Sequence, residues 1–214
     1  MTMSRFFDQY GERLAKAVYT HMFYVLVSVA IAFVVAFFIG VALSRVPKWA
    51  AVLIPVLSLF QTIPGIVFLG VLFLYTGMTP GTVITALSVY AVFPILKNTY
   101  VGLVEVPAAH KEAAKGCGMS AVQSLVRVEI PMAVPTIISG LRMSLVYTVS
   151  WATLSAMIGM GGLGDFIYSG ISSNNNILIL AGALPAAILA VVCSKLIDVV
   201  RIRLIPKPLR RDLK

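Results

Sequence analysis

The sequence from Glu105 to Pro131, EVPAAHKEAAKGCGMSAVQSLVRVEIP, is a polar and charged insert between strongly apolar segments. Pro107 suits the first position of a helix, where its missing N–H leaves no hydrogen bond unmade. The alanine-rich residues after it favour helix, and Gly116 and Gly118 are predicted to end it. The insert is therefore predicted to begin with one short helix.

A second short helix is predicted after these glycines. Ser120, with Gln123 three residues later, has the pattern of a capping box, in which side chains and backbone N–H groups bond reciprocally at a helix start. One face of this helix then continues up to Pro131 through Val122, Leu125, Val126 and Glu129. The insert is thus predicted to be a compact, stiff, amphipathic projection of two helices and a tight turn.

Composition indicates a membrane protein. Hydrophobic residues make up 59% of the 214 residues, charged residues make up 12%, and the mean hydropathy is +0.96. By contrast, about a quarter of the residues of a soluble domain are charged. A net charge of +9 would indicate a nucleic-acid partner in a soluble protein. Here the positive residues lie between and after apolar runs, which is the orientation signal of a membrane chain, so no nucleic acid is expected.

Apolar runs long enough to cross a bilayer recur along the chain. We predict spans at Met22–Leu43, Ala50–Tyr75, Gly81–Leu96 with a continuation past Pro94, Met143–Met160 and Ile177–Ile197. The predicted fold is therefore all-α and polytopic, with about five transmembrane helices in one domain over residues 22–200. At this length we expect room for one bundle and no appended soluble domain.

The two ends of the chain differ from the spans. Residues 1–21 alternate apolar and charged positions and are predicted to form an interfacial helix. A cleaved signal peptide is the competing interpretation, but the apolar run that follows exceeds the ~7 to 15 residues of a signal core. Residues 201–214 are predicted to be a basic cytoplasmic tail.

Two spans contain residues that are costly in hydrocarbon. Gln61-Thr62-Ile63-Pro64-Gly65 puts an amide and a proline at membrane depth, where freed backbone groups must face protein or a water-filled cavity. We predict a kink beside a pathway there. Because a charge at the bilayer centre is unfavourable, we expect Arg142 at the cytoplasmic end of the fourth span and Met132–Gly140 near the interface. Lys195 and Asp198 are predicted interface residues at the inner end of the last span.

The distribution of Lys and Arg predicts an orientation. With the tail inside, the outer loops Thr76–Pro80 and Gly159–Asn176 hold no Lys or Arg. The inner segments hold Arg45, Lys48, Lys97, Lys111, Lys115 and Arg127 besides the tail. The positive-inside rule therefore places the insert in the cytoplasm and the N-terminus outside.

The run Gly159-Met160-Gly161-Gly162-Leu163-Gly164 spells the glycine pattern of a dinucleotide-binding turn. That interpretation lacks a preceding strand and an acidic residue about 20 positions later to bind a ribose. We expect instead close helix packing and a flexible outer gate. The gate residues would be Gly161, Gly162, Gly164 and Asp165.

No pattern in the chain predicts catalysis, a metal or a cofactor. Cys117 and Cys193 have no Cys or His partners at zinc spacing and are interpreted as small structural residues. His21 is predicted to lie at the membrane interface and His110 on a face of the first short helix. The chain contains neither a Gly-x-x-x-x-Gly-Lys-Ser/Thr phosphate loop nor paired intramembrane carboxylates typical of proton-coupled carriers. Energy would have to come from a partner.

The insert resembles the signature of the membrane-spanning permeases of binding-protein-dependent ABC importers. That signature is Glu-Ala-Ala, three residues, Gly, nine residues, then an aliphatic residue, any residue, Leu and Pro. It falls here on Glu112, Ala113, Ala114, Gly118, Val128, Ile130 and Pro131. Val128 and Ile130 are aliphatic replacements for the usual Ile and Leu. An ordinary solvated loop with an alanine-rich helix is the competing interpretation.

This resemblance implies the ABC type I importer permease fold in a bacterial inner membrane. It implies that the insert is the cytoplasmic coupling helix, which docks into a groove of the ATPase. The partners implied are two cytoplasmic ABC ATPase subunits, a second permease subunit, identical or homologous, and an extracytoplasmic solute-binding protein. The chain itself would be a transport subunit and no enzyme, with ATP bound by its partner.

The substrate follows from a narrower likeness, which covers roughly Trp49 to Ile171. Osmoprotectant permeases tend to show Gln-Thr-Ile-Pro in the second span and Ile-Leu-Arg-Asn-Thr-Tyr before the signature. This chain has Gln61–Pro64 and Ile95–Tyr100, with Lys97 for Arg. A Gly-Gly-Leu-Gly-Asp run is common in permeases for osmoprotectants and methionine. The resemblance thus implies glycine betaine, carnitine or choline as the solute.

A quaternary ammonium group has no N–H donors and is held by aromatic faces. The candidate pathway residues are Gln61, Thr62, Pro64, Tyr90, Tyr147 and Trp151. Packing and interface anchoring is the competing interpretation of the aromatic ones. The competing functions are a permease for methionine or another small solute, and an ion-coupled carrier or membrane scaffold without an ATPase. An intramembrane enzyme is disfavoured, since no spaced nucleophile and base are present.

Overall fold

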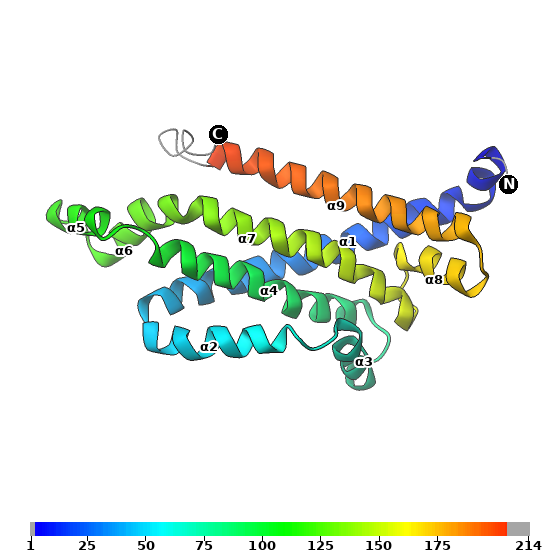
Figure 1. Cartoon of the computed structure of the whole chain (residues 1–214), viewed down its shortest axis with the longest axis horizontal. Helices are drawn as coiled ribbons and strands as arrows, with labels where there is room; N and C mark the ends of the chain where they lie inside the picture. The colour runs from blue at the N-terminus through cyan, green and yellow to red at the C-terminus, as the bar shows by residue number, and fades with distance from the viewer. Residues whose placement is uncertain (1–2, 205–214) are drawn as a thin grey trace.

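The computed structural model describes residues 3–204, and the side chains of residues 8–203. The described chain is all-α, as predicted (Figure 1). The long helices are α1 (Met3–Arg45), α4 (Pro80–Val104), α7 (Ile130–Trp151) and α9 (Asn176–Leu204). The short ones are α2 (Pro47–Phe60), α3 (Gly65–Thr76), α5 (Ala108–Gly116), α6 (Ala121–Ser124) and α8 (Gly164–Ser172), with a π-helical turn at Leu125–Glu129 and a 3₁₀ segment at Ala152–Ile158.

Within residues 3–204, four helices are long and apolar enough to cross a membrane: α1, α4, α9 and the run that contains α7. The α2–α3 pair makes a fifth candidate span, bent by 89°. Helices α1 and α4 are parallel, because Ser28 lies beside Ile84 and Ser88 while Gly40 lies beside Thr99. The chain must therefore return across the bundle between them, and the α2–α3 pair provides that crossing.

Close approach of helix backbones holds the bundle together. Burial of apolar surface gives little net attraction between helices in lipid, so small residues and interhelical hydrogen bonds carry the association. A Cβ added to Gly140 of α7 would lie 2.5 Å from Asn98 Cβ of α4. The Ser144 hydroxyl of α7 donates to the Ala91 carbonyl of α4 at 2.8 Å, and Ser88 donates to the Ser28 carbonyl of α1. Helix α4 is thus fixed on both sides.

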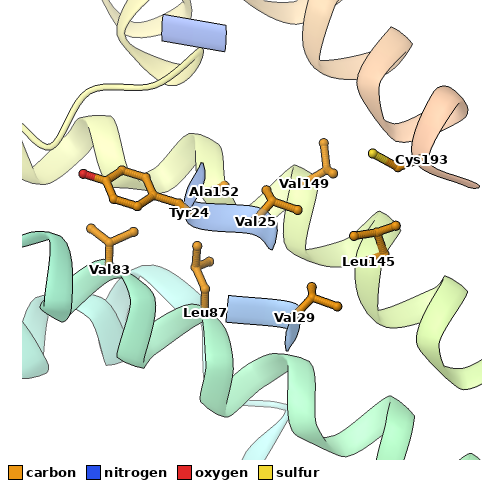
Figure 2. Packing of buried hydrophobic residues seen from close by; sticks show 9 residues of the cluster. All are labelled: Tyr24, Val25, Val29, Val83, Leu87, Leu145, Val149, Ala152 and Cys193. Carbon is orange, nitrogen blue, oxygen red and sulfur yellow. The ribbon is translucent and has the colours of Figure 1, made fainter. Parts of the chain in front are cut away.

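The largest cluster of buried apolar residues lies where α1 passes between α4 and α7. Figure 2 shows its members, which come from α1 (Tyr24, Val25, Val29), α4 (Val83, Leu87), α7 (Leu145, Val149), the 3₁₀ segment (Ala152) and α9 (Cys193). The interpretation of Cys193 as a small structural residue agrees with its place in this cluster. Cys117, in contrast, is exposed.

The N-terminal segment differs from the separate interfacial helix predicted for residues 1–21. Helix α1 runs without interruption from Met3, and residues 1–2 lie outside the described residues. The apolar face of the segment packs on protein: Leu14 and Ala17 contact the cluster that contains Leu163 and Phe166. The segment is therefore the first part of α1, and its apolar face packs against α8 and α9.

Two further boundaries differ from expectation. The predicted loop Gly159–Asn176 contains helix α8, whose Phe166 is fully buried against α9 and α1. Helix α9 continues to Leu204, so the first residues of the predicted tail are helical, and residues 205–214 lie outside the described part of the chain. As Figure 1 shows, α5 and α6 lie at the same end of the bundle as the described end of α9, opposite the start of α1 and α8.

Candidate functional site

The insert at 105–131 forms the projection that its sequence predicts. Helix α4 extends to Val104, and the chain then turns into α5 at one end of the bundle (Figure 1). Lys111 of α5 donates from Nζ to the carbonyl of Leu103 at 3.2 Å, which satisfies a carbonyl in the last turn of α4. Helix α5 is therefore joined directly to the end of a span.

The turn between α5 and α6 depends on Gly118. Its φ is +75°, a left-handed conformation that an L side chain rarely adopts, although a Cβ there would meet open space. The Met119 N–H donates to the Ala114 carbonyl at 3.0 Å across this turn. Ser120 and Gln123 then form the predicted capping box, with the Ser120 N–H donating to Gln123 Oε1 at 2.9 Å. The prediction of two helices and a tight turn is confirmed.

The signature residues divide into an exposed group and a packed group. Glu112, Ala113 and Gly118 are exposed at the tip, whereas Ala114 is buried and closes the turn from within. At the base of the insert Val128, Ile130 and Pro131 are half-buried, and Ile130 packs against a buried cluster of α4 and α7. The exposed group is available to a partner, and the packed group anchors the insert to the spans.

The sequence predicted that the helix ends at Pro131, but in the structure the helix continues through this residue. The π-helical turn at Leu125–Glu129 leads directly into α7, and Pro131 lies in the first turn of that helix. The Ile130 N–H donates to the Leu125 carbonyl in this turn, so Pro131, which has no N–H to donate, lies within a continuous run of helix. The insert and the fourth span therefore form one continuous helical path.

Glu129 is the functional candidate that the sequence did not reveal, since it had been placed on an apolar helix face. Its side chain is 4% exposed and accepts a 2.8 Å hydrogen bond from Arg45, the last residue of α1. It also accepts from Ser124 Oγ at 3.2 Å and lies 4.0 Å from Lys111 Nζ of α5. One carboxylate thus joins the insert to both α1 and α7. Its position in an otherwise apolar face was the available signal, because buried charges are paired.

The predicted kink at Gln61–Gly65 is confirmed as the break between α2 and α3. Tyr90 of α4 holds this break: its hydroxyl donates to the Ile63 carbonyl at 2.8 Å, and Gln61 Nε2 donates back to the Tyr90 carbonyl at 3.0 Å. Thr62 is exposed and donates to the Leu59 carbonyl, and Pro64 is the N-cap of α3. The polar groups freed by the break are therefore paired within the protein.

The structure brings four of the predicted pathway residues together. Gln61, Tyr90, Tyr147 and Trp151 line one small hollow beside the break. Tyr90 and Trp151 meet edge to face with centroids 3.9 Å apart, and Tyr90 is 4% exposed. These two rings serve packing in this conformation. Tyr147, at 52% exposed, offers a free aromatic surface.

The predicted outer gate is a tightly packed junction. Gly161 and Gly162 have positive φ values, and a Cβ at Gly164 would overlap the Thr153 carbonyl. Asp165 lies in the first turn of α8, where a carboxylate suits the helix dipole. Burial raises the pKa of the Asp165 carboxyl, and the positive charge of Arg13 opposes that shift. A gating role for these residues stays a prediction.

Two polar residues that were predicted near the membrane interface are paired with other helices. His21, expected at an interface, is fully buried, and its Nε2 lies 3.0 Å from the Val149 carbonyl of α7. Arg142, expected at the cytoplasmic end, lies near the middle of α7 because that helix starts at Ile130. Its guanidinium is stabilised by two residues of α9: Nε donates to Ser194 Oγ at 2.7 Å, and Nη1 lies 3.3 Å from Asp198 Oδ1. The membrane depth of both residues stays a prediction, and partners on other helices make each polar side chain tolerable.

Among the residues with described side chains, no group of three or more His, Cys, Asp or Glu side chains could hold a metal ion. The candidate site has three parts: the projecting insert at one end of the bundle, the charge cluster around Glu129 at its base, and the broken α2–α3 span. These parts suit a membrane-spanning bundle with an exposed projection at one end.

Several characterised proteins are similar to this chain over almost their whole length. The carnitine transport permease protein OpuCB of Listeria monocytogenes is 40% identical, with 96% of this chain and 94% of the relative covered. The glycine betaine/carnitine/choline transport system permease protein OpuCB of Bacillus subtilis is 36% identical, with 97% and 96% covered. The osmoprotectant import permease protein OsmW of Salmonella typhimurium is 36% identical, with 92% and 94% covered.

Solved structures show the same fold. An inward-facing structure of the MetNI methionine ABC transporter contains a chain that matches with a TM-score of 0.83 and 21% identity, over 96% of this chain and all of that one. A chain of an amino acid ABC transporter matches with a TM-score of 0.76 and 16% identity, over 95% and 99%. A family model described as "Binding-protein-dependent transport system inner membrane component" matches residues 29–209. The chain therefore belongs to the family of inner-membrane components of binding-protein-dependent transport systems.

Proposed function

We propose that this chain is the permease subunit of an ATP-driven importer for quaternary-amine osmoprotectants such as glycine betaine, carnitine or choline. The observation that carries the proposal is the near full-length similarity to permeases named for these solutes, at 36 to 40% identity. The Gln61–Pro64 run, which supported this substrate class in the sequence, forms the break in the second span. The chain would form the pathway and would use the ATPase activity of a partner.

The projecting insert is the proposed ATPase contact. Helix α5 presents Glu112 and Ala113 on an exposed surface, and the Gly118 turn sets its direction relative to α6. Because Lys111 bonds to the end of α4 and the chain continues without a break into α7, a displacement of the insert reaches two spans at once. The Glu129–Arg45 ion pair adds α1 to this connection.

The proposed assembly contains two cytoplasmic ATPase subunits, a second permease subunit and an extracytoplasmic binding protein. Closure of the ATPase dimer would move the two inserts and open the pathway outward, and hydrolysis would return it inward. The proposed orientation has the insert in the cytoplasm and the N-terminus outside. This orientation is supported by the Lys and Arg residues of the segments that lie near the α5–α6 end of the bundle.

A transport measurement tests the function. The permease, expressed with its ATPase and binding protein, should take up radiolabelled glycine betaine, carnitine or choline in a saturable manner. The uptake should stop when the ATPase is inactivated by substitution. Competition by methionine alone would assign a different solute, and uptake that persists without an active ATPase would support an ion-coupled carrier instead.

The native cysteines test the orientation and the docking surface. Cys117 is exposed beside the Gly118 turn and Cys193 is buried. A membrane-impermeant maleimide should label Cys117 in inside-out vesicles but not in intact cells. Added ATPase should slow that labelling by covering the insert. A Ser173→Cys variant, exposed at the opposite end, provides the control and should label from outside; labelling of Cys117 from outside would invert the topology.

The turn is tested by a matched pair of glycines. A Cβ would meet open space at both Gly116 and Gly118, but only Gly118 has a left-handed φ. Gly118→Ala therefore forces that conformation on an alanine, which costs about 1–2 kcal/mol, and Gly116→Ala does not. Gly118→Ala should therefore lower transport and transport-coupled ATP hydrolysis, and Gly116→Ala should leave both unchanged. Equal effects of the two variants would remove the turn from the coupling mechanism.

The charge cluster is tested by Glu129→Ala. Removing one partner of a buried ion pair costs roughly 3–5 kcal/mol, and we expect about 2 kcal/mol here because Arg45 is 43% exposed. The variant should unfold at a lower temperature in detergent and should hydrolyse ATP with less uptake per ATP. Glu105→Ala, which removes an exposed carboxylate from the same insert, is the control. Wild-type stability and coupling in Glu129→Ala would contradict the proposed connection.

A further inference from the structure

A groove of about 600 Å³ lies between α7 and α9 and is open on one side. Its lining is mostly apolar, with polar groups from Ser139 and Arg142 of α7 and from Ser194 and Lys195 of α9. The volume is within the range of small-molecule sites. Tyr147, the exposed aromatic residue of the predicted pathway, borders the same groove.

The charges of this groove lie on two candidate spans, with Arg142 near the middle of α7 and Lys195 nine residues before the end of α9. Arg142 is twelve residues from the start of α7 and nine from its end, or about 18 and 13 Å along the helix axis. Ionisable side chains on membrane-spanning helices face the bundle interior or a water-filled cavity, and they mark the paths of ions and substrates. The groove is therefore a candidate part of the pathway.

A comparison with α1 supports this assignment. Between Met22 and Leu43 that helix has no charged residue, and its outer surface consists of apolar side chains that include Phe23, Leu26, Val34 and Phe38. Such a surface suits lipid. The open face of α7 carries Ser139, Arg142 and Ser150 beside the exposed Met143 and Tyr147, so this face is more polar than the outer surface of α1.

The groove carries one excess positive charge. The Arg142 guanidinium donates from Nε to Ser194 Oγ at 2.7 Å and pairs through Nη1 with Asp198 at 3.3 Å. Its Nη2 makes no hydrogen bond within the described part of the chain. Lys195 forms no ion pair with any residue whose side chain is described. Asp198 therefore orients Arg142, and two cationic groups keep donors free for an anion.

We propose that Arg142 and Lys195 bind the carboxylate of a zwitterionic quaternary amine during its passage, while Tyr147 offers its ring to the ammonium group. This inference rests on the proposed function. The chemistry matches, since guanidinium and ammonium groups donate charge-assisted hydrogen bonds to carboxylates and a quaternary ammonium is attracted by an aromatic face. The site distinguishes solutes with a carboxylate, such as glycine betaine and carnitine, from choline, which has none.

Lys195→Gln is the cleanest test because it removes a free charge and leaves the Arg142–Asp198 pair intact. In proteoliposomes with the complete transporter and saturating binding protein, the maximal uptake rate of glycine betaine or carnitine should fall about tenfold, the order expected for one charge-assisted hydrogen bond. Choline uptake should be unchanged. Arg142→Gln/Asp198→Asn, which removes the ion pair without changing the net charge of the groove, should show the same selectivity, and Arg142→Lys alone should retain part of the carboxylate uptake.

Lys48→Gln, at an exposed inner turn, serves as the control and should leave both solutes unaffected. An equal loss for choline and glycine betaine, or no loss for either, would overturn the inference. So would a loss that appears only in vesicles with anionic phospholipid, which would assign the groove to a lipid headgroup. Wild-type uptake of choline alone would also overturn it but would leave the proposed function standing. Wild-type failure to transport any quaternary amine would overturn both.

Discussion

The Glu129 carboxylate is the contact on which the arrangement of the projecting end depends. It lies at the base of the insert, almost without solvent, and is shared by Arg45 of α1, Ser124 of α6 and Lys111 of α5. A buried carboxylate without these donors would be strongly unfavourable, so the three elements must stay together for the charge to be tolerated. The insert is consequently attached to the bundle by side chains as well as by its two chain connections.

The other constraint is the need to satisfy backbone polar groups inside a membrane. The α2–α3 break frees such groups. The Tyr90 hydroxyl donates to the Ile63 carbonyl within the break, and Gln61 donates to the Tyr90 carbonyl of α4. Arg142 meets the same requirement through Ser194 and Asp198. Gln61, Tyr90 and Arg142 thus have partners on other helices, whereas Ser139 and Ser150 donate to carbonyls of their own helix. This explains why the exposed polar face of α7 is compatible with a membrane fold.

Much of the fold could be predicted from local patterns. The apolar runs gave the all-α class and about five spans, the capping box at Ser120 gave the start of α6, and the proline-containing run at Gln61–Gly65 gave the break. These features depend on residues close together in sequence. Two predicted boundaries were wrong. The helix continues through Pro131, where an end was predicted, and the predicted loop at 159–176 contains α8, which packs on α9 and α1.

The sequence by itself determined the membrane class and the insert with its signature spacing, because hydropathy and capping are local properties. Only the tertiary structure decided the partners of buried polar residues. His21 reaches Val149, Glu129 reaches Arg45 and Arg142 reaches Asp198, across separations that no sequence window spans. Helix packing sets these pairs, since the free energy of a charge in a membrane protein depends on what the neighbouring helix offers.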